Sequence, residues 1–390
     1  MKKFFRNTAV LAFGFGMAMT FTACHSGDSA EEPQAPAAKD ASNTVVSNRM
    51  LLVQTNVAAT VKYNNANPSA KSGTLYTFNG AAQSGSLTVS ATGYKSQTVS
   101  VAFGENTAKL VNVQLVKAAT NGQAKVAGQS VSVSNEDQNQ RDNAIDGTDV
   151  VATIDVPEDV TVDADHANDK FSIVVFTPAS GDAQDVEKKG DQIAEAVLAV
   201  DCEPDGAKFD KPVTVTVNIP GSSKLDLRLK HKASGEVKTI GNGLTREGDM
   251  IKATIEHFSQ WDYELIANAE EVVTEEKLIY SEDKVVNAGQ QRVSFTQWIG
   301  YDANNAPASL IGKFLKNTYS TVAREIRNSF TYTAAEKSQA HVEVYQKVKN
   351  IVFKSGEETF KVLSYGTISH KVMLTPTEEP VPVHSGGSSL

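Results

Sequence analysis

The sequence predicts a mainly β protein, with tandem small β-sandwich domains followed by an α+β C-terminal unit that carries one helix on a sheet. Apolar residues alternate with polar ones in several short segments, and turn-forming Gly, Asn and Pro residues separate these segments. The helix is indicated because, after Pro307, apolar residues recur at helical spacing. At 390 residues the chain has room for about two or three domains.

Residues 1–23 have the pattern of a lipoprotein signal peptide. A basic start (2–6) precedes a short apolar segment (9–19), which is below the roughly 20 residues that span a bilayer. The Phe-Thr-Ala-Cys sequence that ends at Cys24 resembles a lipobox, with Phe21 in place of the usual Leu. The resemblance implies cleavage before Cys24, attachment of diacylglycerol to its thiol and acylation of the new amine. An ordinary secretory signal with an incidental Cys is the alternative.

Charge and cysteine content narrow the set of partners. The net charge is −9, and removal of residues 1–23 would leave 34 basic against 46 acidic residues, a net charge of −12. This balance argues against nucleic acid and against adsorption to anionic lipid. Cys202 is the only other cysteine, so we expect no intramolecular disulfide and a small buried side chain. Without a second hydrophobic span, the N-terminal lipid is the expected membrane anchor.

Residues 24–48 are expected to form a flexible tether, because Ala, Ser, Asp, Glu and Pro dominate and no periodicity is present. Asp28, Glu31 and Glu32 lie soon after Cys24. In lipoproteins of the Bacteroides group, a similar acidic patch near the lipidated Cys is a signal for export to the outer face. The resemblance implies a lipoprotein of the outer membrane that is exposed at the cell surface. A solvated linker is the alternative interpretation.

Residues 49–117 are predicted to form a small β domain, with strands near 51–53, 60–63, 86–92, 97–103 and 111–115. The turn Ala91-Thr92-Gly93-Tyr94-Lys95 and the closing strand resemble the PEGA-type β domain of bacterial surface proteins. Where that family has Pro-Glu-Gly-Ala, this chain has Asn-Val-Ala-Ala at 56–59. The resemblance therefore implies a surface β module and gives little support to glycan binding.

Residues 118–268 are predicted to form a larger β-sandwich. Its clearest strand is 213–219, where Val213, Val215 and Val217 alternate with polar residues at period two. Further strands are expected at 150–162, 171–176, 225–230 and 251–255. The segment 192–200 fits either a strand or a short helical turn.

The sandwich resembles the ZU-type domain shared by ankyrins, netrin receptors and zonula-occludens proteins. The matching residues are Pro204-Asp205-Gly206, Phe209, Lys211-Pro212-Val213 and His257-Phe258-Ser259 followed by Trp261. Some such domains cut themselves at His-Phe-Ser. The resemblance implies that Ser259 Oγ attacks the carbonyl of Phe258 in an N-to-O acyl shift, with His257 as general base and water hydrolysing the ester. The alternative is a strand end in which the His and Ser have only structural roles.

Strand parity bears on the backbone at this tripeptide. Ile251, Ala253 and Ile255 share one face, so a regular strand would point His257 inward and Phe258 outward. Burial of Phe258 would therefore require a bulge or kink before it, and such a kink is where a distorted peptide could lie.

Two acidic clusters carry the oxygen ligands that calcium prefers. One holds Asp142, Asp146 and Asp149, and the other lies at 163–169. Neither follows the spacing of the helical-hand calcium loop, so the sequence favours solvated turns. The seven histidines show no zinc-ligand spacing, and we expect no metal and no cofactor.

Residues 269–376 are predicted to form the α+β unit, for which no family is identified. Its helix is expected at about 308–328, and its strands at 291–301, 340–353, 358–364 and 369–374. Residues 377–390, rich in Pro, Gly and Ser, are expected to be a disordered tail.

These features predict an envelope-anchored lipoprotein with a binding or adhesion role, whose partner is an extracellular or envelope protein or a glycan. The first alternative is a self-processing protein that cleaves between Phe258 and Ser259. A glycan-processing enzyme that uses carboxylates of the C-terminal unit is a further alternative, without a motif to support it. Apart from self-cleavage, the sequence predicts no enzyme.

Overall fold

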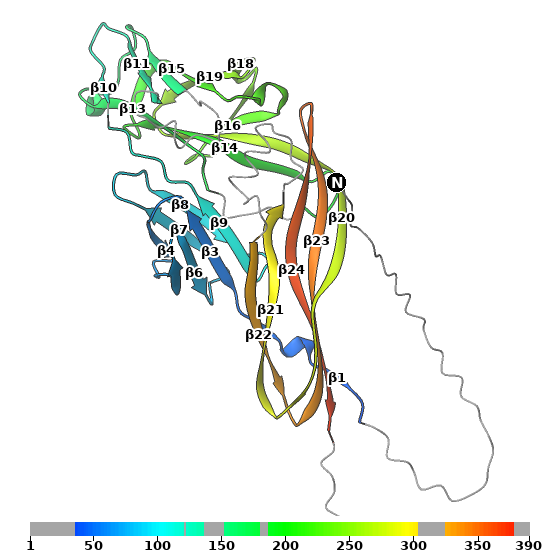
Figure 1. The fold of residues 1–390 in the computed structure, drawn as a ribbon. Helices are drawn as coiled ribbons and strands as arrows, with labels where there is room; N and C mark the ends of the chain where they lie inside the picture. The colour runs from blue at the N-terminus through cyan, green and yellow to red at the C-terminus, as the bar shows by residue number, and fades with distance from the viewer. Residues whose placement is uncertain (1–35, 121, 136–151, 180–185, 303–323, 378–390) are drawn as a thin grey trace, which may run out of the picture.

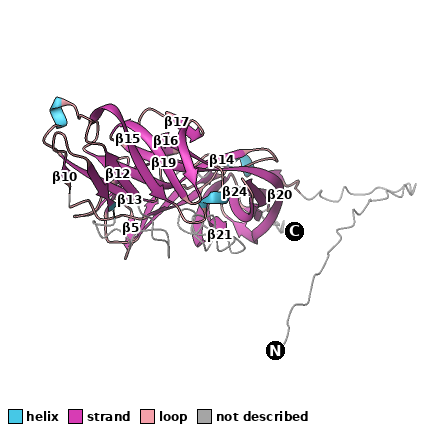
Figure 2. Cartoon of the chain, turned by 90° about the horizontal axis from the view of Figure 1, so that it is seen from above, coloured by secondary structure: helices cyan, strands magenta, loops and turns pink. Residues whose placement is uncertain are grey.

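The computed structural model describes residues 36–120, 122–135, 152–179, 186–302 and 324–377. In these ranges the chain forms strands and short 3₁₀ turns (Figure 2). Within the same ranges no helix is long and apolar enough to cross a membrane.

The first β domain contains two facing sheets (Figure 1). One has the order β5-β6-β3-β9, with β3 and β9 parallel, and the other has the order β4-β7-β8. Alternating apolar residues such as Leu87 and Val89 of β7 point into the core between the sheets. The strands are β3 (Met50–Thr55), β4 (Thr60–Tyr63), β5 (Ala70–Ser72), β6 (Leu75–Asn79), β7 (Ser84–Ser90), β8 (Gln97–Ala102) and β9 (Ala108–Val113).

The larger sandwich also has two layers. The segment 192–200, for which the sequence allowed either a strand or a short helical turn, lies in strand β14. One layer pairs in the order β11-β12-β15-β19-β18, and the other in the order β13-β14-β20-β16-β17. A parallel pairing of β17 with β18 joins the layers. The strands are β10 (Gln123–Ala124), β11 (Val131–Ser134), β12 (Ala152–Val156), β13 (Lys170–Phe176), β14 (Gln192–Glu203), β15 (Lys208–Asn218), β16 (Leu227–His231), β17 (Val237–Ile240), β18 (Gly243–Glu247) and β19 (Met250–His257), with 3₁₀ turns η4 (Ala164–His166) and η5 (Ser222–Lys224).

One continuous strand, β20 (Gln260–Val286), runs from the sandwich into the C-terminal unit. Its first part pairs with β14 and β16, and its second part pairs with β23. At about 3.3 Å per residue, a strand of 27 residues spans roughly 90 Å. The other long strands of the unit are β21 (Gly289–Asp302), β22 (Arg324–Ala334), β23 (Ser338–Ser355) and β24 (Glu358–Pro376).

The last part of the predicted tether is folded onto the C-terminal unit. Strand β1 (Lys39–Asp40) pairs with β24, and β2 (Val46–Ser47) pairs with β22. Between them, the 3₁₀ turn η1 (Ser42–Thr44) follows Ala41, which is buried and joined to β24 by a backbone hydrogen bond of 2.7 Å to Val372. These pairings extend the two sheets of the unit, so residues 39–47 belong to the folded structure.

The predicted α+β unit is wrong, because the described part of residues 269–376 is built from strands. Of the helix expected at 308–328, residues 308–323 lie outside the described ranges, and residues 324–328 belong to β22. There Ile326, Asn328 and Phe330 are buried and alternate with exposed Glu325 and Arg327, which is period two. Pairing with β21, a partner distant in sequence, provides the backbone hydrogen bonds that a helix would make locally.

The first β domain contacts both other units. Lys95, in the turn before β8, forms a partly buried ion pair with Asp201 of β14, and Gln97 accepts a hydrogen bond of 3.1 Å from the backbone N–H of Ala179. On its other side, Leu52 packs with Ile299 and Ile326 of the C-terminal unit. A cleft lies next to this second contact.

Candidate functional site

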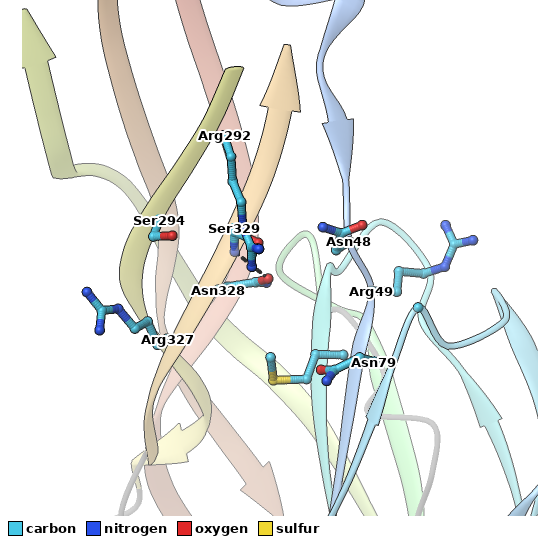
Figure 3. A pocket seen from close by; sticks show the side chains of 10 residues that line it. Asn48, Arg49, Asn79, Arg292, Ser294, Arg327, Asn328 and Ser329 are labelled. Atoms are coloured by element: carbon cyan, nitrogen blue, oxygen red, sulfur yellow. Dashed lines mark hydrogen bonds between the residues drawn. The ribbon is translucent and has the colours of Figure 1, made fainter. Parts of the chain in front are cut away.

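An open cleft of about 510 Å³ lies between the first β domain and the C-terminal unit (Figure 3). Side chains and backbone from four strands and their ends form its walls. Its lining residues are Asn48, Arg49, Met50, Asn79, Gly80, Arg292, Ser294, Arg327, Asn328 and Ser329.

The wall from the C-terminal unit is the outward face of the β21–β22 hairpin. Ser294 pairs with Ser329 across the two strands, so these residues project on one side, and Arg292 and Arg327 lie on the same faces of their strands by the two-residue period. Arg292 lies over Ser329 and donates a hydrogen bond of 3.2 Å from Nη2 to its Oγ (Figure 3). Asn328 is buried, and its Oδ1 accepts a hydrogen bond of 2.8 Å from the backbone N–H of Ser329.

The opposite wall is formed where the chain passes from β2 to β3. Because Ser47 pairs with Phe330, Asn48 and Arg49 enter the first β domain beside β22. Arg49 donates a hydrogen bond of 3.0 Å from Nε to the carbonyl oxygen of Ala81, which holds its side chain against the end of β6. Figure 3 shows Asn48 and Asn79 facing the gap, while the guanidinium groups of Arg49 and Arg327 point to its two outer sides.

The cleft is positively charged on a chain that is acidic overall. Three of its 10 described lining residues are arginines and none is a carboxylate, although the net charge of the chain is −9. Within the described part of the chain, none of the three guanidinium groups has a carboxylate within ion-pair distance. The cleft therefore offers uncompensated cationic donors at its surface, a favourable arrangement for an anion.

The His-Phe-Ser tripeptide lies at the corner between β19 and β20. Phe258 is fully buried, with its ring edge-on to Phe171 and Phe209 at centroid distances of 5.0 and 4.7 Å. Strand β19 ends at His257 and β20 begins at Gln260, so Phe258 lies in a break between strands, where its side chain is not bound by the parity of β19. The aromatic side chain thus completes the core of the sandwich.

The carbonyl and amide of Phe258 are fixed by the turn after β14. Gly206 donates its N–H to the Phe258 carbonyl oxygen at 2.9 Å, and the Phe258 N–H donates to the Ala207 carbonyl at 2.8 Å. Ser259 is buried, and its own carbonyl accepts from the Cys202 N–H at 3.1 Å. The Gly206 N–H is the kind of donor that would stabilise negative charge on the Phe258 oxygen during attack by a hydroxyl.

His257 belongs to an aromatic cluster on the side of the corner. Its ring stacks with Trp261 at 5.7 Å and lies edge-on to His231 at 4.8 Å. His231 Nδ1 lies 2.6 Å from Ser234 Oγ and accepts the Ser234 N–H at 3.2 Å. Burial, and to a smaller extent the charge of His257, lower the pKa of His231. The surroundings of His231 therefore favour its neutral imidazole. Within the described residues no hydrogen bond joins His257 to Ser259. The expected general base therefore has no hydrogen bond to the hydroxyl that it would deprotonate.

The other predicted sites give fewer observations. Cys24 and the acidic residues Asp142, Asp146 and Asp149 lie outside the described ranges. In the second acidic cluster, Asp163 accepts the backbone N–H groups of Asp165 and His166 at the start of η4. Within the described residues no group of three or more His, Cys, Asp or Glu side chains is arranged to hold a metal ion.

Cys202 is buried in the sandwich core, as the sequence predicted, and burial raises the pKa of its thiol well above the usual value.

Sequence reasoning missed the cleft. The polar residues Arg292, Ser294 and Thr296 alternate with buried apolar ones, which indicates a polar strand face, but nothing local indicates what that face meets. Recognition of the cleft requires the pairing of β2 with β22, which brings residues 48–50 beside β22.

None of the family models and none of the curated proteins compared with this chain matches it. A solved structure from Bacteroides fragilis NCTC 9343, of a protein of unknown function proposed to be membrane-associated, is similar to 85% of this chain and 98% of its own length. The identity is 12% and the TM-score is 0.22. A TM-score this low supports no argument about fold or role, so the proposals below depend on the residues of this chain.

Proposed function

We propose that this protein is a lipoprotein of the outer membrane, anchored through Cys24, that presents β modules outward to bind a partner. The basic start, short apolar segment and Ala-Cys junction at residues 2–24 support the anchor, and the acidic residues that follow support the outward face. The resemblances to PEGA-type and ZU-type modules support a role in binding rather than in catalysis, as part of this proposal.

The observation that carries the proposal is the docking of β1 on β24. Only residues 25–38 separate Cys24 from Lys39, and a chain of that length reaches at most about 50 Å. Figure 1 shows β1 near one end of the molecule, whereas the sandwich with β10, β11 and β18 lies at the opposite end. A lipid on Cys24 would therefore hold the C-terminal unit near the membrane and leave the loops of the sandwich farthest from it.

Three measurements test anchoring and orientation. Intact mass of the protein from membranes should show the added lipid, and Cys24→Ala should move the protein to the soluble fraction. Proteolysis of intact cells should remove the sandwich, while a periplasmic marker stays uncut. An unlipidated chain, or complete protection of the protein in intact cells, would contradict the corresponding part of the proposal.

Self-cleavage is the second candidate function, and the fixed corner at Phe258 favours it. The strand break after His257 and a hydrogen bond from Gly206 to the Phe258 carbonyl are features that an N-to-O acyl shift at Ser259 would use. Mass spectrometry of the chain from residue 25 onward, under denaturing conditions, should then show two masses that sum to the mass of the chain plus one water. Ser259→Ala should give one mass. A single mass for the unaltered chain would assign His257-Phe258-Ser259 a structural role only.

A further inference from the structure

The arginine-lined cleft has no part in anchoring or in self-cleavage. We propose that it binds an acidic saccharide, a ligand with sugar hydroxyls and at least one carboxylate or sulfate group. This inference adds a site and a ligand class to the proposed binding function. The biological role of the site rests on that proposed function, but binding of the ligand to the cleft does not. It can be tested without lipid and without cells.

The negative group of the ligand is inferred from the guanidinium groups. Arg327 has no hydrogen-bond or ion-pair partner within the described residues, and Arg292 and Arg49 each use one N–H group, on Ser329 and on the Ala81 carbonyl. Arg292 therefore retains donors within the cleft, and Arg49 and Arg327 retain donors at its two outer sides. The planar fork of each guanidinium matches the two oxygens of a carboxylate or sulfate. An uncharged ligand would leave this local positive charge uncompensated.

The hydroxyl groups of the ligand are inferred from the other lining residues. Asn48, Asn79, Ser294 and Ser329 offer amides and hydroxyls, which both donate and accept hydrogen bonds as sugar hydroxyls do. Met50 is the only large apolar residue in the described lining, and no aromatic ring is among them. A nucleobase would find no aromatic ring to stack on among the described lining residues, whereas the hydroxyl groups of a saccharide would find amide and hydroxyl partners.

The size and rigidity of the cleft agree with a small bound ligand. Its volume of about 510 Å³ lies within the range of small-molecule sites. One wall lies on β22, which is held between β21 and β2 by backbone pairing, and Asn328 and Ser329 of that wall are buried. The polar groups of Asn328 and Ser329 are thus positioned before a ligand arrives, which reduces the entropy cost of binding at this wall.

Calorimetric titration of the chain from residue 25 onward, which keeps every described residue, tests the proposal. The probes are trigalacturonate, a sulfated disaccharide, and maltotriose as the neutral control. We expect at least one acidic saccharide to bind and maltotriose not to bind. Affinity should fall when salt is raised from low concentration to about 0.15 M, because the partners are exposed charges.

Variants assign the binding to the cleft. Arg292→Gln and Arg327→Gln should each weaken binding about tenfold, the effect of one charge-assisted hydrogen bond. Lys361→Gln is the matched control, because it removes one positive charge from an exposed position on β24 outside the cleft and should leave affinity unchanged. If Arg292→Gln fails to fold, Arg327→Gln alone decides, since its guanidinium supports no contact within the described residues.

Several results would overturn the proposal. These are absence of binding to both acidic saccharides, binding that Lys361→Gln weakens as much as the cleft variants do, and equal binding of maltotriose. Preference for hexaglutamate or for anionic phospholipid vesicles over the saccharides would assign the cleft to a different class of partner. Each of these results leaves lipid anchoring intact, and a soluble, unlipidated native protein would leave the binding result intact.

Discussion

The corner at Phe258 and the arginine-lined cleft are opposite kinds of region. At the corner, three aromatic rings close the sandwich core, and the backbone of Phe258 is hydrogen-bonded on both sides. In the cleft, guanidinium, amide and hydroxyl groups from two units are accessible to solvent, and the guanidinium groups retain unused hydrogen-bond donors. The corner has a recognisable sequence motif and internal partners, whereas the cleft has no motif and its guanidinium groups have no carboxylate partner among the described residues. Stability should therefore depend on the first region and ligand binding on the second.

The largest expected effect is that of Phe258→Ala. Removal of a fully buried ring from between Phe171 and Phe209 should cost about 3–5 kcal/mol of unfolding free energy, because it leaves a cavity in the core. Urea denaturation followed by circular dichroism measures this loss. A loss below about 1 kcal/mol would mean that the corner is not part of the core. The stability of the protein would then not distinguish the corner from the cleft.

Acid should weaken the unit that carries the cleft wall. His370 of β24 packs against the buried ring of Phe330 at 4.2 Å, and burial lowers the pKa of His370 to about 4. In the unfolded chain His370 has a pKa near 6.5, so it takes up a proton at a higher pH than in the folded protein. The contribution of the neutral His370 ring to stability is therefore complete above pH 6.5 and is lost as the pH falls towards 4. The loss should be at most about 3 kcal/mol, and smaller because the side chain is partly accessible to solvent.

Urea denaturation at pH 7 and at pH 4.5 measures this effect, and His370→Gln should reduce the difference between the two values. His341→Gln is a suitable control, because the hydrogen bond to Asp283 raises the pKa of His341 and gives it the opposite pH dependence. If His370→Gln loses as much stability in acid as the unaltered chain, other groups are responsible.

A smaller effect is expected at the turn that fixes the corner. Gly206 has a φ of 88°, and a Cβ there would meet no atom within 4 Å, so Gly206→Ala adds backbone strain without a clash. The cost should be about 1–2 kcal/mol. Gly235→Ala, at a φ of 75° and with equally open space, is the matched control away from the corner. If self-cleavage occurs, only Gly206→Ala should slow it, because that strain displaces the donor to the Phe258 carbonyl.

Strands with a clear two-residue alternation could be predicted, whereas segments whose apolar residues fit two periods, or whose strands form only along the edge of another unit, could not. The alternation in Val213–Val217 predicted β15, and the parity of Ile251–Ile255 showed what burial of Phe258 would require. The helix predicted at 308–328 was wrong over its described end, residues 324–328, because that end pairs with β21 and its apolar residues fit two periods. The folding of residues 39–47 was also missed, because these polar strands form only along edges that β22 and β24 provide.

The smallest expected effect on stability is that of the cleft variants. The Arg327 side chain is exposed and has no partner within the described residues, and Arg292 is exposed with one partly buried hydrogen bond, so changing either to Gln should alter the unfolding free energy by no more than about 0.5 kcal/mol. Thermal denaturation beside Lys361→Gln measures this. A loss above about 2 kcal/mol would mean that the arginines hold the two units together, and the contrast with the Phe258 corner would disappear.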